Sequence, residues 1–172
     1  MKLGNNVSCG EIFEYERPDK YIVESEEYNE NSKTPVLTAN KAFILGYTDE
    51  DKVYKKEKES IIFDDFTLDS KFVDFPYMVK SSAIKILTLK DRNRDNLRFS
   101  FELLNNTKFD MLGHARHYIS VVQHKEVLTP NKLEQDEIAI FFERIDHLIT
   151  LHQRKLESLK KIKKSLLEKM FI

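Results

Sequence analysis

Residues 131–172 read NKLEQDEIAIFFERIDHLITLHQRKLESLKKIKKSLLEKMFI, a stretch without Pro or Gly. Asn131 is a predicted helix N-cap, with Glu134 three residues later in the capping-box position. Apolar side chains then recur in alternating steps of four and three, which is coiled-coil spacing. The positions of this stripe are Ile138, Phe142, Ile145, Ile149, His152, Leu156, Leu159, Lys163, Leu166 and Met170.

The stripe predicts a helix that needs a partner. About 36 helical residues would extend about 54 Å, at about 1.5 Å per residue. A domain of about 130 residues cannot cover that length, so we expect the helix to pair with another. A helix folded back on its own domain stays open as the alternative. The positions expected to form the dimer contact are Ile145, Ile149, His152, Leu156, Leu159, Lys163, Leu166 and Met170.

The sequence changes character at Thr129-Pro130, which sets predicted domains at 1–130 and 131–172. Residues 1–130 predict a globular mixed α/β domain, so the chain is α+β with one long C-terminal helix. Short runs rich in β-branched and aromatic residues predict strands. Two stretches, 11–16 and 96–105, favour helices. The expected strands cover 21–23, 35–38, 60–63, 83–89 and 118–122.

Composition excludes several classes of protein. No apolar run approaches the ~18–20 residues that a membrane span needs, and residues 1–6 lack the apolar core of a signal peptide. The single cysteine, Cys9, supports neither a disulfide framework nor a cysteine zinc site, which favours a cytoplasmic protein. Four glycines form no phosphate-binding loop.

Charged side chains are distributed unevenly along the nearly neutral chain. Residues 1–70 carry 9 basic and 16 acidic side chains, a formal charge of −7. Residues 71–130 carry 10 and 6, a charge of +4, and residues 131–172 carry 9 and 7, a charge of +2. A net charge of −1 therefore does not exclude a local basic surface for nucleic acid.

Two patterns suggest chemistry. Asp64, Asp65 and Asp69 with Lys71 resemble a metal-dependent nuclease cluster, since carboxylates hold Mg²⁺ and a lysine orients water. Ordinary solvent-facing acidic residues are the competing interpretation. His114, His117 and His124 have spacing compatible with zinc, but Arg116 among them would repel a cation. No metal site is expected.

A second group favours nucleic-acid binding. Basic residues interleave with aromatic and hydroxyl side chains, which can contact phosphates and base edges. A glycine-started segment, 113–118, combines a guanidinium, an imidazole and a phenol ring, and we expect it at the DNA surface. A surface segment without such a role is the alternative. The expected DNA-binding residues are Lys41, Lys71, Lys80, Ser81, Arg116, His117 and Tyr118.

These segments resemble a known family. The tail from Ile149 to Phe171, and the stretch 133–146 before it, look like the conserved helical region of DNA-specificity subunits of type I restriction–modification systems. The opening residues 2–4, the stretch 34–46 and the stretches 113–120 and 127–130 resemble the target-recognition domain of that family. Family members usually carry two recognition domains and two helical regions, whereas this chain has one of each, like a half-length subunit.

The resemblance implies a non-catalytic protein that reads double-stranded DNA. Its partners would be methyltransferase and restriction subunits, together with a second copy of the chain joined through the helix. No cofactor is expected on this chain, because S-adenosylmethionine would bind the methyltransferase. No membrane partner is expected. A metal-dependent nuclease and a coiled-coil scaffold without a DNA role are the alternative functions.

Overall fold

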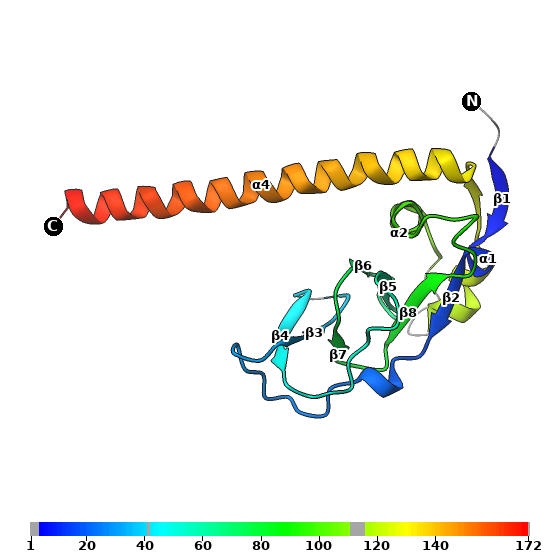
Figure 1. The fold of residues 1–172 in the computed structure, drawn as a ribbon, viewed down its shortest axis with the longest axis horizontal. Coiled ribbons are helices and arrows are strands. Elements are labelled where there is room, and N and C mark those ends of the chain that lie inside the picture. Colours follow the sequence, from blue (N-terminus) through cyan, green and yellow to red (C-terminus); the bar gives the residue numbers. More distant parts are fainter. Residues whose placement is uncertain (1–3, 41, 111–115, 172) are drawn as a thin grey trace. The chain divides into compact units, whose positions relative to one another are not determined.

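The computed structural model describes residues 4–40, 42–110 and 116–171. It divides the chain into two compact units, Met1–Gln135 and Asp136–Ile172. The first unit is a mixed α/β domain, and the second consists of the long C-terminal helix (Figure 1). The expected α+β class with one long terminal helix is therefore confirmed.

The first unit is built on a four-stranded sheet. Its strands are β2 (Phe13–Glu16), β8 (Ile84–Leu89), β5 (Ser60–Asp64) and β6 (Ser70–Val73), in that spatial order. All neighbouring pairs are antiparallel. The β5–β6 connection is a short hairpin, whereas β2 and β8 are distant in sequence. Strands predicted at 60–63 and 83–89 are thus confirmed as the centre of the sheet.

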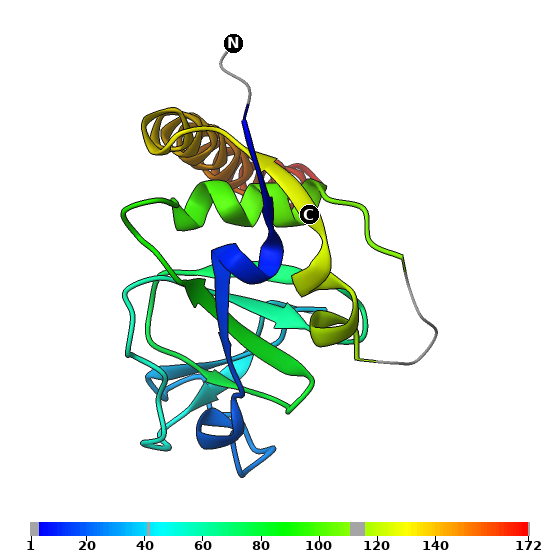
Figure 2. The same cartoon turned by 90° about the vertical axis from the view of Figure 1, so that its right-hand side faces the viewer.

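Both faces of this sheet are covered. Because side chains alternate along a strand, Ile61 and Phe63 face one core while Ile62 faces the other. The first core also contains Leu97 and Leu104 of α2 (Leu97–Asn106), which Figure 2 shows beside the sheet. Burial on both faces makes β5 a continuous apolar run rather than an alternating one.

A second sheet has the order β4-β3-β7. Strand β3 (Thr34–Leu37) pairs antiparallel with β4 (Ile44–Thr48) and parallel with β7 (Met78–Val79). The strand expected at 35–38 is confirmed as β3. A two-stranded sheet of β1 (Asn5–Ser8) and β9 (Glu126–Thr129) joins the two ends of the domain.

Short helical elements complete the domain. Helix α1 (Cys9–Ile12) and the 3-10 turn η1 (Asp19–Tyr21) flank β2. Helix α3 (His117–Ser120) and the 3-10 turn η2 (Val122–His124) precede β9. The predicted helix at 96–105 is confirmed as α2, whose first turn is capped by Asn96 Oδ1 accepting the Phe99 N–H at 3.0 Å.

Three local predictions were wrong. Residues 11–16 contain the end of α1 and then β2, because pairing with β8 extends residues 13–16. Residues 21–23 contain only an isolated bridge from Ile22 to Val79 beside the η1 turn. Residues 118–122, expected as a strand, lie in α3, in a turn at Val121 and at the start of η2. Their backbone hydrogen bonds include the local one from the Val121 N–H to the His117 carbonyl oxygen and the one from the Tyr118 N–H to Asp65 Oδ1, neither of which belongs to a strand ladder.

Helix α4 (Lys132–Met170) begins where the sequence predicts. The Oδ1 atom of Asn131 accepts the Glu134 N–H at 3.1 Å, which confirms the N-cap. Along the described part of the second unit, leucines of the stripe remain about half exposed, at 52% for Leu156 and 53% for Leu159. Within the described residues, we find no helix with the length and apolarity of a membrane span.

Candidate nucleic-acid interface

The carboxylates of Asp64 and Asp69, which suggested a nuclease site, form hydrogen bonds within the turn after β5. Asp64 is buried, and its Oδ1 accepts the N–H groups of Phe66 and Thr67, both at 2.9 Å. Asp69 Oδ2 accepts the Thr67 hydroxyl at 2.8 Å. Among the described residues, no cluster of three metal-ligating side chains occurs. These carboxylates shape a tight turn, so the geometry gives the nuclease interpretation no support.

Asp65 connects this turn to the segment that starts at Arg116. Its Oδ1 accepts the Tyr118 N–H at 2.8 Å, and its carbonyl oxygen accepts the His117 N–H at 2.9 Å. The Nδ1 atom of His117 lies 3.0 Å from the same carbonyl oxygen. His117 and Tyr118 are consequently buried, at 0% and 1% exposure.

This burial corrects the expectation that both side chains lie at the DNA surface. The Tyr118 ring packs against Phe63 and Tyr15, with centroids 5.7 and 5.1 Å apart. Burial also raises the pKa of the Tyr118 hydroxyl well above its usual value. His117 and Tyr118 therefore hold the segment in place and leave the exposed position to Arg116.

Arg116 is exposed and directed over an aromatic ring. Its guanidinium carbon lies 5.9 Å from the centroid of the Phe66 ring, within cation–π range. Phe66 is itself 40% exposed, so its ring is accessible beside the guanidinium. We call this pair, a guanidinium beside an exposed aromatic ring, the Arg116–Phe66 platform.

A shallow pocket of about 450 Å³ contains two more of the expected residues, Lys80 and Ser81. The Phe66 ring also lines this pocket, so the pocket adjoins the Arg116–Phe66 platform. The amide of Asn40 and the hydroxyls of Thr38 and Ser81 supply further donors and acceptors. We call this cavity the Lys80 pocket. Its lining residues are Glu26, Tyr28, Thr38, Asn40, Leu45, Asp64, Phe66, Lys80, Ser81 and Ala83.

Lys80 is held by a carboxylate and a ring. Its Nζ lies 2.6 Å from Glu26 Oε1 and 5.9 Å from the centroid of the Tyr28 ring. The hydrogen bond with Glu26 raises the pKa of Lys80, and the same bond lowers the pKa of Glu26. Both ionised groups are therefore favoured, and Lys80 is fully charged at neutral pH.

The two remaining residues expected to bind DNA, Lys71 and Lys41, are not among those that line the Lys80 pocket. Lys71, on β6, lines a separate recess with Phe101 and Asn105 and is not brought to the Lys80 pocket. Lys41 lies outside the described residues. Sequence reasoning missed Phe66 and Asn40, because neither belongs to a periodic pattern or a basic run. The only available signal at Phe66 was its place directly after two aspartates.

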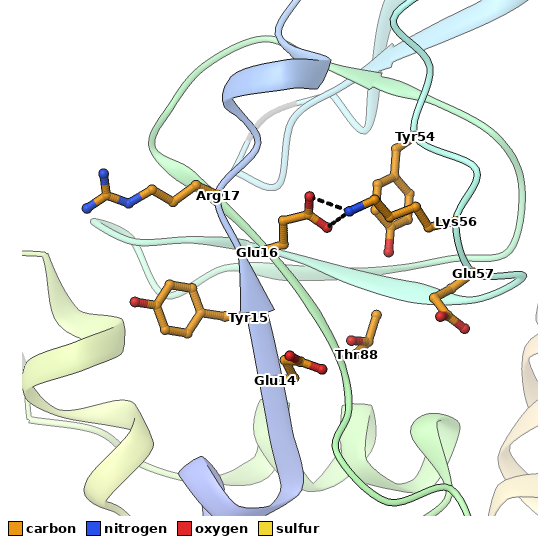
Figure 3. Close-up of a pocket in the computed structure, with 8 residues that line it drawn as sticks. All are labelled: Glu14, Tyr15, Glu16, Arg17, Tyr54, Lys56, Glu57 and Thr88. Atoms are coloured by element: carbon orange, nitrogen blue, oxygen red, sulfur yellow. Dashed lines mark hydrogen bonds and ion pairs between the residues drawn. The ribbon is translucent and has the colours of Figure 1, made fainter.

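A different pocket, of about 570 Å³, lies at the opposite end of β8 (Figure 3). Three carboxylates line it, and only Arg17 and Lys56 oppose them. Lys56 is already bound by both oxygens of Glu16, at 2.7 and 2.9 Å. Its lining therefore carries a formal charge of −1, as does the lining of the Lys80 pocket with Glu26, Asp64 and Lys80. The lining residues of the pocket in Figure 3 are Glu14, Tyr15, Glu16, Arg17, Tyr54, Lys56, Glu57 and Thr88.

The Glu26–Lys80 pair leads to a first prediction. Glu26→Gln should raise the affinity for any DNA duplex by about twofold to fivefold at low salt, because Lys80 loses a competitor for phosphate. The measurement is fluorescence anisotropy over a salt series. Glu27→Gln, which removes the same charge one residue away, is the matched control. Equal gains from both variants would assign the effect to net charge rather than to Lys80.

Comparisons with known proteins agree with the resemblance. Residues 2–161 match the family described as the type I restriction modification DNA specificity domain. The specificity subunit of the type I restriction enzyme EcoR124I/EcoR124II of Escherichia coli is 43% identical over 125 residues, which cover 70% of this chain and 31% of that protein.

Two solved structures share the fold. The S subunit of a type I restriction–modification system from M. genitalium aligns with a TM-score of 0.63 and 18% identity, over 86% of this chain and 41% of that one. A second structure, described as showing complex assembly and conformational transition of the type I restriction–modification system, aligns with a TM-score of 0.57 and 14% identity. The alignment covers 87% of this chain and 40% of that one. The chain spans about a third of the curated relative's length. The family match covers most of the sequence, and the chain belongs to the type I restriction modification DNA specificity domain family.

Proposed function

We propose that the chain is a non-catalytic, sequence-specific DNA reader that works as a half-length specificity subunit. The observation that carries this proposal is the convergence of Lys80, Ser81 and the Arg116–Phe66 platform around one shallow pocket. These side chains come from different parts of the sequence, and the fold brings them to one surface. The family membership of the chain supports the same function.

The chemistry of this surface fits a DNA groove. A guanidinium can donate two parallel hydrogen bonds to the O6 and N7 atoms of guanine, and an ammonium can contact a phosphate. The hydroxyl of Ser81 can contact either, since it both donates and accepts. In this proposal Arg116 reads a base, Lys80 binds the backbone, and Lys41 and Lys71 add further backbone contacts.

Helix α4 would join two copies of the chain. Its apolar stripe is exposed over Leu156, Leu159 and Leu166, and burying such a stripe requires a facing helix. A homodimer would supply two recognition domains, one from each copy of the chain. Ile145, Ile149, His152, Lys163 and Met170 would complete the contact.

Other subunits would perform the chemistry. We propose that the dimer directs a methyltransferase subunit and a restriction subunit to the target site, in the cytoplasm where the DNA is found. S-adenosylmethionine would bind the methyltransferase, and this chain would bind no cofactor. The similar Escherichia coli protein is a specificity subunit of a restriction enzyme, which supports this division of labour.

A shift assay with a labelled DNA library, run with and without Mg²⁺, separates the possible functions. A reader should shift the duplexes under both conditions and leave them intact. Cutting that requires Mg²⁺ and disappears in Asp69→Asn would establish the nuclease instead. The absence of both shifting and cutting, with the methyltransferase subunit added, would leave a coiled-coil scaffold without a DNA role.

A further inference from the structure

A buried ion pair includes Asp65, the residue that directly precedes Phe66 of the Arg116–Phe66 platform. Lys85 Nζ lies 3.1 Å from Asp65 Oδ2, and the two side chains are 2% and 1% exposed. Moving two charges out of water costs several kcal/mol per ion, and their attraction often does no more than offset that cost. An apolar pair would often be equally stable, so stability alone does not account for charges at these two positions.

Asp65 uses every polar group it has to connect separate segments. Its N–H donates to the Ala83 carbonyl oxygen at 2.9 Å, which attaches the turn to the start of β8. Its carbonyl oxygen and its Oδ1 accept the N–H groups of His117 and Tyr118, at 2.9 and 2.8 Å. The two residues that follow Arg116 are therefore fixed by this one aspartate.

The same turn fixes the ring on which Arg116 lies. Phe66 follows Asp65 directly, and its N–H donates to Asp64 Oδ1 at 2.9 Å. The guanidinium carbon of Arg116 lies 5.9 Å from the Phe66 centroid. A displacement of Asp65 would therefore move both components of the platform relative to each other.

We infer that Asp65, with Lys85 as its buried counter-ion, is a positioning residue that sets the direction of Arg116. The inference rests on the proposed role of Arg116 in reading DNA. The carboxylate of Asp65 accepts the Tyr118 N–H through Oδ1 and pairs with Lys85 through Oδ2 at the same time. Preorganisation of Arg116 reduces the ordering cost of binding, because fewer rotamers are lost at the interface.

The test separates positioning from stability. Asp65→Leu combined with Lys85→Met removes both charges while keeping an apolar filling, so the domain should still fold. In this Leu/Met variant the Tyr118 N–H loses its acceptor. The backbone from Arg116 to Tyr118 should therefore shift, and the Arg116 guanidinium should move away from the Phe66 ring. Asp65→Asn combined with Lys85→Gln is the conservative pair, because the Asn oxygen can still accept the Tyr118 N–H.

A DNA-free measurement checks the geometry. In the wild-type protein, NMR should show upfield ring-current shifts for the Arg116 side-chain protons, and Phe66→Leu should abolish them. The Leu/Met pair should abolish them as well, whereas the Asn/Gln pair should retain them. Unchanged shifts in the folded Leu/Met pair, or lost shifts in the folded Asn/Gln pair, would overturn the inference. If the Leu/Met pair does not fold, lost shifts in the folded Asn/Gln pair still overturn the inference.

A double-mutant cycle with Arg116→Ala connects the geometry to function. The probe is a duplex selected from a random library by the wild-type chain with the methyltransferase subunit, compared with a scrambled duplex. Arg116→Ala should weaken selected-duplex binding at least about fivefold in the wild-type background and less than about twofold in the Leu/Met background. Additive losses would overturn the inference. No loss from Arg116→Ala alone would instead refute the proposed role of Arg116 and leave the NMR test standing.

Discussion

A chain in which Leu156 and Leu159 are both replaced by Glu should sediment as a monomer under conditions in which the wild-type chain is a dimer. Both leucines belong to the stripe on α4, where they are about half exposed on the single helix. Burial of each leucine contributes roughly 1.5 kcal/mol or more, and a dimer buries four of them. The dissociation constant should therefore rise by at least about 10⁴-fold.

The control for this experiment adds the same charge away from the stripe. Ser158→Glu with Ser165→Glu also changes the charge by two units, and both serines lie on the side of the helix away from the stripe. This variant should remain a dimer in analytical ultracentrifugation. An unchanged mass for the leucine variant would mean that α4 does not join two copies.

The charge along α4 favours antiparallel pairing. Residues 132–150 carry 2 basic and 5 acidic side chains, a formal charge of −3, whereas residues 151–172 carry 7 and 2, a charge of +5. Antiparallel helices place the acidic half of one copy beside the basic half of the other. Parallel helices would place two strongly basic halves together, which is unfavourable. Antiparallel pairing would also place the recognition domains at opposite ends.

Arg116→Ala should produce the second largest of the expected effects, a loss of affinity for DNA. If the guanidinium reads a guanine through two hydrogen bonds, the selected duplex should lose about 1–3 kcal/mol of binding free energy, and discrimination at one base pair should relax. If it contacts phosphate instead, every duplex should lose affinity equally and the salt slope should fall by about one. Anisotropy titrations with selected and scrambled duplexes distinguish the two.

Arg17→Ala is the matched control for that experiment. Arg17 is also exposed, but it lines the acidic pocket at the other end of β8 (Figure 3). Its loss should leave the affinity for both duplexes within about twofold. A larger effect from Arg17 than from Arg116 would place the DNA surface at the acidic end of the domain and contradict the assignment.

The sequence predicted those elements whose signals are local. The N-cap of α4, its stripe and the Asn96 cap of α2 depend on residues a few positions apart. The central strands β5 and β8 were recognisable as apolar runs. By contrast, β1 pairs with β9 across more than a hundred residues, and neither strand carries a pattern that predicts such a partner.

The candidate site illustrates the same limit. The sequence identified Arg116, Lys80 and Ser81 by residue type, but not the Phe66 ring that lies under Arg116. It also placed Tyr118 at the surface, whereas the hydrogen bond to Asp65, a residue 53 positions away, draws that segment inward. Residue chemistry thus indicated which side chains could bind DNA, and only the fold showed which of them meet.

The central claim, that two copies of this chain read DNA together, is tested most directly by selecting bound duplexes from a random library and sequencing them. A two-fold symmetric dimer imposes its symmetry on the DNA it reads. The account predicts an enriched motif of two identical, inverted half-sites separated by a spacer of fixed length. Arg116→Ala should relax the same base pair in both half-sites. A single unrepeated half-site, or no enriched motif with the methyltransferase subunit present, would contradict it.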